Sequence, residues 1–112
     1  MKRLQLIINP TAGTKQGKKY LAEIIAYFGS NGYISTVFVT EKRGDATEFV
    51  VNYAAEHDLI VCIGGDGTFN EVVAGLMSSA IDVPVGYIPA GSTNDLRQAL
   101  SCPRILFRHA AI

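Results

Sequence analysis

The chain has no tryptophan, only two cysteines and no excess of either charge. Cys62 lies within an apolar run and Cys102 stands just before a proline, so the pair predicts neither a disulfide framework nor a metal site. Lysine plus arginine equal aspartate plus glutamate at ten each, without the basic excess that nucleic-acid-binding surfaces usually show. We therefore expect no nucleic-acid partner.

Long hydrophobic runs are also missing. No apolar stretch approaches the roughly 20 residues that a membrane-spanning helix needs. Met1 to Arg3 lead directly into a short strand-like run rather than a secretory signal. With 112 residues, of which 48% are hydrophobic and 18% charged, the chain suits one globular domain. We expect a cytoplasmic protein, and peripheral contact with the inner face of the membrane stays open.

Short apolar runs alternate with helical segments along the chain. Strands are predicted at residues 4–8, 33–40, 59–63 and 84–88. Helices are predicted at residues 18–28, 45–57, 70–79 and 92–100. Gly32 is expected to end the first helix in a left-handed conformation. Asp45 is expected to be the N-cap of the second, with Glu48 completing a capping box.

This alternation predicts an α/β fold, a parallel sheet with helices on both faces. Right-handed crossovers would bring the carboxyl ends of all the strands to one edge of the sheet. Ligands of such sheets bind along that edge. Polar, glycine-rich segments follow the strands and would converge there: Asn9 to Thr11, Thr40, Gly64 to Asn70 and Pro89 to Asn94.

The segment after the third predicted strand carries the chemistry. Gly64, Gly65 and Gly67 would let backbone N–H groups approach phosphate oxygens. Asp66 would hold Mg²⁺, directly or through water, or accept the proton of an attacking hydroxyl. Thr68 would donate to a phosphate or cap the next helix. The structural alternative is a glycine turn in which Asp66 and Thr68 act only as caps.

The segment Gly64 to Glu71, followed by Val72 to Leu76, resembles the signature of the diacylglycerol kinase catalytic domain family. That family includes bacterial lipid kinases and sphingosine kinases. Three further segments carry the resemblance, in the same order and spacing: Asn9 to Gly13, Thr40-Glu41 with Gly44 to Ala46, and Ile88 to Asp95. The glycine-rich core alone is less specific, since NAD kinases and phosphofructokinases carry similar cores. The resemblance implies a three-layer nucleotide-binding domain similar to theirs.

The resemblance also implies ATP and Mg²⁺ as cofactors, with Asp66 as the catalytic residue and the metal ligands left open. It implies nucleotide contacts at Asn9, Pro10, Thr11, Ala12, Gly13, Thr40, Gly64, Gly65, Asp66, Gly67, Thr68, Phe69, Asn70, Glu71 and Ser92. Structural alternatives stay open for several of them. Asn9 and Pro10 could simply end a strand, Thr40 could be an ordinary strand residue, and Ser92 could be an N-cap. Ser92 also departs from the family's usual threonine but keeps the hydroxyl.

The resemblance divides the chain into a nucleotide-binding domain at residues 1–100 and a linker or stub of amphipathic helix at residues 101–112. Family members continue into a second, β-rich domain, which these 112 residues lack. We therefore expect weak or no activity from these residues alone, because phosphoryl transfer needs an aligned acceptor and little water.

The predicted function is transfer of the γ-phosphoryl group of ATP to a lipid hydroxyl, of diacylglycerol or a related lipid. The expected partners are the nucleotide and the lipid substrate, and a homodimer stays open. One alternative is an NAD-kinase-like enzyme acting on a ribose hydroxyl. The other is a non-catalytic nucleotide-binding module that docks a partner through its apolar tail.

Overall fold

The computed structural model describes residues 1–10, 21–89 and 106–108, the last three as backbone alone. Its centre is a five-stranded sheet in the order β2-β1-β3-β4-β5. The first four strands pair in parallel, and β5 pairs antiparallel with β4. The elements are β1 (Lys2–Ile8), α2 (Leu21–Ser30), β2 (Tyr33–Val39), α3 (Asp45–Tyr53), the 3₁₀ turn η1 (Ala54–Glu56), β3 (Leu59–Gly64), α4 (Asp66–Ser79), β4 (Pro84–Pro89) and β5 (Leu106–Arg108).

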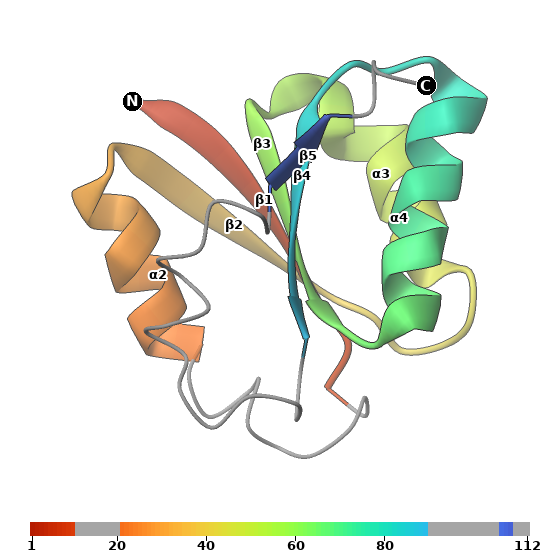
Figure 1. Cartoon of the computed structure of the whole chain (residues 1–112), viewed down its shortest axis with the longest axis horizontal. Helices are drawn as coiled ribbons and strands as arrows, with labels where there is room; N and C mark the ends of the chain where they lie inside the picture. The colour runs from red at the N-terminus through yellow and green to blue at the C-terminus, as the bar shows by residue number, and fades with distance from the viewer. Residues whose placement is uncertain (11–20, 90–105, 109–112) are drawn as a thin grey trace.

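Helices cover both faces of the sheet, as Figure 1 shows: α2 lies on one side, and α3 and α4 lie together on the other. Alternate residues of β1 and β3 supply the two cores. Leu4, Leu6 and Ile8 pack with Ile24 and Phe28 of α2. The opposite core joins Ile7, Ile60 and Cys62 to residues of α3 and α4. Burial on both faces explains why these strands are continuous apolar runs. The predicted three-layer α/β fold is confirmed.

The strand order creates a crevice between β1 and β3. The chain leaves β1 through α2 to reach β2 on one side, and it returns through α3 on the other face to reach β3. The connections therefore diverge at the carboxyl ends of β1 and β3, which is where open α/β sheets bind ligands. The Asn9 backbone N–H donates to the Ile63 carbonyl at 3.0 Å, so the two strands stay paired up to this point.

The third predicted helix begins earlier than expected. The structure starts α4 at Asp66 rather than at residue 70, with Gly65 as its N-cap. The Phe69 N–H donates to the Gly65 carbonyl at 3.1 Å and closes the first turn. An aspartate in the first turn is favoured by the helix dipole. Asp66 to Thr68 are therefore helical residues, and only Gly65 links the strand to the helix.

Two other helix ends test the capping predictions. Gly32 has φ +91°, which confirms the left-handed end of α2. The prediction that Asp45 is an N-cap is wrong, because Gly44, with φ +94°, is the N-cap of α3 and Asp45 is its first residue. The Asp45 carboxylate points back to the preceding loop instead, where it accepts the N–H groups of Glu41 and Lys42.

The tail also differs from the prediction. Leu106–Arg108 form β5 and pair with β4 at Pro84 to Gly86, where the sequence suggested a linker or a helical stub. Strand pairing between distant segments leaves no local signal in so short a stretch. The predicted helix at 92–100 lies outside the described residues. The predicted domain division at residue 100 stays a prediction, although β5 ties residues 106–108 to the same sheet.

Within the described parts of the chain, no helix is long and apolar enough to cross a membrane. Cys62, at the centre of β3, is fully buried against α3 and α4 and carries a free thiol. Burial, with a smaller contribution from the charge of Glu71, raises the pKa of this thiol to about 12. Cys62 is therefore a core residue with an unreactive sulfur.

Gly75 lets α3 and α4 pack closely, and we expect Gly75→Ala to destabilise the fold by about 1–3 kcal/mol. A methyl group there would lie 2.9 Å from Val50 Cβ and 3.0 Å from the Thr47 carbonyl oxygen, so the helices would have to separate. Urea unfolding measures the change. The control is Gly29→Ala in α2, where an added methyl meets no described atom within 4 Å. Equal stability of the two variants would contradict the assigned packing.

Candidate functional site

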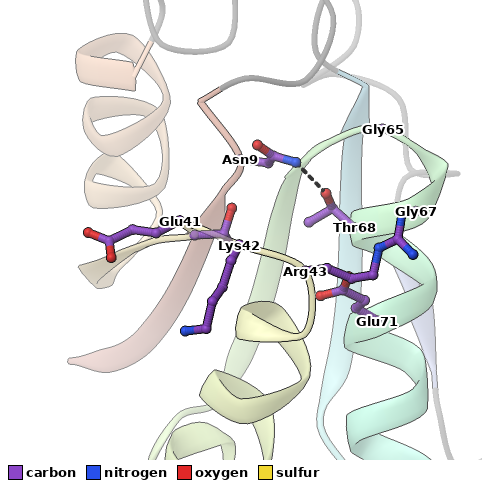
Figure 2. A pocket seen from close by; sticks show the side chains of 9 residues that line it. Asn9, Glu41, Lys42, Arg43, Gly65, Gly67, Thr68 and Glu71 are labelled. Atoms are coloured by element: carbon purple, nitrogen blue, oxygen red, sulfur yellow. Dashed lines mark hydrogen bonds between the residues drawn. The ribbon is translucent and has the colours of Figure 1, made fainter.

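A cavity of about 300 Å³ opens at the carboxyl ends of β1, β2 and β3 (Figure 2). It lies at the crevice that the strand order creates. Three segments form its walls: the end of β1, the loop between β2 and α3, and the start of α4. The lining residues are Asn9, Thr40, Glu41, Lys42, Arg43, Gly65, Gly67, Thr68 and Glu71.

A side-chain hydrogen bond joins two walls of the cavity. Asn9 Nδ2 donates to Thr68 Oγ1 at 3.1 Å, and Figure 2 shows the two side chains facing each other across the crevice. Gly64 permits this approach, because a Cβ there would lie 3.0 Å from Thr68 Oγ1 and 3.1 Å from Thr68 Cβ. Gly64 is thus required by packing. Since Thr68 Oγ1 accepts the bond from Asn9, its own O–H is available to donate to a ligand.

Gly65 and Gly67 have no such structural requirement. No described atom lies within 4 Å of a Cβ built at either position. Gly65 has φ −97°, and neither residue has a positive φ. Both line the cavity at the N-terminal end of α4, where unpaired N–H groups and the helix dipole favour an anion. What the glycines provide is therefore space at an anion-binding position.

The loop between β2 and α3 is held in place from both ends. The Asp45 carboxylate accepts the N–H groups of Glu41 and Lys42 at 2.8 and 3.0 Å. Glu71 of α4 holds the other end, since its Oε1 accepts the Gly44 N–H at 3.1 Å. The Glu71 carbonyl also accepts the Thr47 hydroxyl at 2.7 Å. Glu71 therefore braces the loop against α4.

Two basic residues of this loop line the cavity. Lys42 Nζ lies 3.0 Å from Asp45 Oδ1, and Arg43 extends toward the first turns of α4 (Figure 2). A cation beside the N-terminus of a helix is unfavourable by itself, because the dipole is positive there. An anion between Arg43 and the helix would be attracted by both. Lys42 and Arg43 were not predicted from the sequence, although two adjacent basic residues in the turn after a predicted strand were a usable signal.

Asp66 is exposed and does not line this cavity. Its Oδ1 accepts a hydrogen bond from the Tyr87 hydroxyl of β4 at 3.2 Å. The Tyr87 ring packs against Phe69 with 4.9 Å between ring centroids. Partial burial and the neighbouring Asp66 carboxylate raise the pKa of Tyr87 to about 12. Tyr87 was not predicted as a site residue, because an aromatic residue in an apolar strand is typical of a core position.

A family model described as the diacylglycerol kinase catalytic domain matches residues 3–111. The chain belongs to this family. A diacylglycerol kinase of Bacillus subtilis (strain 168) is 45% identical over 105 residues, which are 93% of this chain and 35% of that protein. A diacylglycerol kinase of Staphylococcus epidermidis is 40% identical over 103 residues, which are 91% of this chain and 33% of that protein.

The crystal structure of a diacylglycerol kinase from Bacillus anthracis str. Sterne matches this chain with a TM-score of 0.72 and 32% identity. The match covers 92% of this chain and 38% of that one. The chain thus spans about a third of the length of the curated relatives that it matches. The resemblance inferred from the four sequence motifs is confirmed.

Against the contacts expected for this family, the structure brings six predicted residues together at the cavity: Asn9, Thr40, Gly65, Gly67, Thr68 and Glu71. Five other predicted contact residues are described by the structure but do not line the cavity: Pro10, Gly64, Asp66, Phe69 and Asn70. Their nucleotide contacts stay predictions. The remaining four, Thr11, Ala12, Gly13 and Ser92, lie outside the described residues.

We expect the stability that Asp45 confers on this member of the diacylglycerol kinase family to be lost in acid. Hydrogen bonds from the Glu41 backbone and then from Lys42 hold the pKa of Asp45 below its ordinary 3.8. A lowered folded pKa gives stability that is complete above 3.8 and is lost as the pH falls through the folded value. Asp45→Asn should therefore be less stable than wild type at about pH 6, and the difference should shrink toward about pH 3.

Urea unfolding across this pH range measures the difference. The control is Glu56→Gln, which removes an exposed carboxylate from η1, away from the loop. The pH dependence assigned to Asp45 is the difference between the two variants. A pH-independent cost of Asp45→Asn would contradict the role assigned to the charged carboxylate.

Proposed function

We propose that this chain is the nucleotide-binding part of an ATP-dependent lipid kinase, which transfers the γ-phosphoryl group of ATP to a lipid hydroxyl. One observation carries the proposal: Gly65 and Gly67 line the cavity although neither the backbone conformation nor the described packing requires glycine there. Space beside helix N–H groups is what phosphate oxygens need. Membership of the diacylglycerol kinase catalytic domain family supports ATP as the source of those phosphates.

The phosphates would lie against the first turn of α4. N–H groups at Gly65 and Gly67 would donate to them, together with the Thr68 hydroxyl that Asn9 holds in place. Arg43 would face the phosphates from the opposite wall, and Glu71 would keep that wall at a fixed distance. These groups stabilise the charge that develops on the phosphoryl group during transfer.

Asp66 would act near the γ-phosphate, as a metal-linked carboxylate or as the base for the lipid hydroxyl. The described residues contain no group of three or more acidic, histidine or cysteine side chains that could hold a metal. Mg²⁺ is compatible with this arrangement, because it usually binds through one or two carboxylates together with substrate phosphates. When bound, it would neutralise charge on the phosphate oxygens. We assign this role to Asp66, the first residue of α4, because it stands between Gly65 and Gly67, which both line the cavity.

The acceptor would be a lipid with a free hydroxyl, and the relatives' names point to diacylglycerol. A lipid acceptor implies that the protein works at the inner face of the membrane as a peripheral, cytoplasmic enzyme. We place the nucleotide-binding part at residues 1–100. Leu106–Arg108 return to the same sheet as β5, so the lipid-binding part would follow after this strand.

Incubation of the full-length native protein with γ-labelled ATP tests the proposal. Vesicles prepared from a total lipid extract with added diacylglycerol, and a parallel sample of NAD, serve as acceptors. Label in the lipid fraction supports a lipid kinase. Label only in NADP would show an NAD-kinase-like enzyme, and tight ATP binding with no transfer to either acceptor would show a non-catalytic module. Either of these two results overturns the proposal.

A further inference from the structure

We propose that Tyr87 is a positioning residue for Asp66. The Tyr87 hydroxyl fixes the orientation of the Asp66 carboxylate, which acts in phosphoryl transfer. This inference rests on the proposed function. The Tyr87 hydroxyl donates to Asp66 Oδ1 at 3.2 Å and joins β4 to the first residue of α4. A donor on one carboxylate oxygen restricts rotation of the side chain. The second oxygen, Oδ2, is then presented in a constant direction.

The position of the hydroxyl is itself fixed by packing. Tyr87 lies beside Cys62 in the register of β4 and β3, on the face of the sheet that α4 covers. Its ring packs against Phe69, three residues after Asp66, with ring planes 31° apart. Both the hydrogen bond and the ring contact therefore join Tyr87 to the first turn of α4. A side chain held at its ring has little freedom to move its hydroxyl away.

The direction of this hydrogen bond follows from the two groups: the tyrosine hydroxyl carries the proton and donates, and the carboxylate accepts. The interaction is therefore a neutral donor on a charged acceptor, which is stronger than a bond between neutral groups. An exposed carboxylate such as Asp66 has no comparable constraint from burial. Tyr87 supplies the orientation that burial would otherwise give.

The functional role can be separated from packing, because Tyr87→Phe removes only the hydroxyl and keeps the ring that packs on Phe69. We expect Tyr87→Phe to lower kcat about tenfold in the full-length enzyme, with the KM for ATP changed less than about twofold. Calorimetry should show the same affinity for ATP as wild type. The melting temperature should fall only slightly, as expected for the loss of one exposed hydrogen bond.

The matched control is Tyr53→Phe. Tyr53 also packs its ring against a phenylalanine, Phe38, at 5.3 Å, but it lies at the far end of α3 from the cavity. Its loss of a hydroxyl should leave kcat, KM and ATP affinity unchanged. The decisive comparison adds Tyr87→Phe to Asp66→Asn. If Tyr87 acts through Asp66, the double variant should be no slower than Asp66→Asn alone.

The outcomes separate this inference from the proposed function. A wild-type kcat in Tyr87→Phe, together with an inactive Asp66→Asn, would overturn the role of Tyr87 and leave the kinase assignment standing. Equal losses of ATP affinity and turnover would show a structural role and also overturn it. No lipid phosphorylation by wild type, or full activity of Asp66→Asn, would overturn the proposed mechanism and this inference with it.

Discussion

Asp66→Asn is expected to reduce turnover of the full-length enzyme by about 10²–10⁴-fold while the fold stays intact. The amide keeps the size of the side chain and an oxygen that can still accept the Tyr87 hydroxyl. It loses the negative charge that would bind Mg²⁺ or accept a proton. Asp66 is exposed in the first turn of α4, so the structural cost should be only the helix-dipole contribution, about 0.3–1 kcal/mol.

Steady-state transfer of label from ATP to lipid, with a parallel melting curve, measures both parts of this prediction. The control is Asp82→Asn, an exposed aspartate between α4 and β4 at the opposite end of the helix. It removes the same charge from the molecule as a whole and should leave turnover unchanged. Comparable turnover in the two variants would show that Asp66 has no catalytic role.

Gly67→Ala should weaken ATP binding by about 10–100-fold without lowering the stability of the protein. The added methyl group meets no described atom within 4 Å, and alanine is favoured over glycine in a helix. The methyl would, however, occupy space in the cavity, which Gly67 lines at the N-terminal end of α4, where we propose that the phosphates bind. Binding and stability should therefore change in opposite directions, a combination that general damage to the fold would not produce.

Isothermal calorimetry with ATP and urea unfolding are the two measurements. Gly29→Ala again provides the control: this glycine of α2 also has open space at its Cβ but lies outside the cavity. It should gain stability and bind ATP like wild type. Unchanged ATP affinity in Gly67→Ala would contradict the assignment of this end of α4 to the phosphates.

The sheet was predictable because its central strands are buried on both faces. Such strands leave continuous apolar runs in the sequence, as Leu59 to Ile63 do. The boundary between β3 and α4 was harder to predict. Several glycines close together suggest a loop. The N–H groups of the first helical turn, however, make no intrahelical hydrogen bonds, and glycines are tolerated there. The start of α4 was therefore predicted too late, and Asp66 to Thr68 were predicted to be loop residues.

The site was predicted where local motifs define it and missed where it depends on distant contacts. Gly65, Gly67 and Thr68, which line the cavity, belong to one continuous motif. Tyr87 is 21 residues from Asp66, and only the pairing of β4 with β3 brings the two together. The role of Asp45 was likewise hidden, because a positive φ at Gly44 shifted the helix start by one residue and turned the carboxylate toward the loop.

The buried thiol of Cys62 provides a probe for opening of the central sheet. Because burial raises the pKa of this thiol, very little of it is ionised at pH 8, and the surrounding core excludes reagents. In a Cys102→Ala background, alkylation of Cys62 can proceed only when β3 separates from its neighbours. The rate of labelling then reports how often the sheet opens. A nucleotide that binds only the closed form slows this rate by the factor 1 + [L]/Kd. The labelling rate of Cys62 therefore measures both the stability of the sheet and the fraction of the protein that has nucleotide bound.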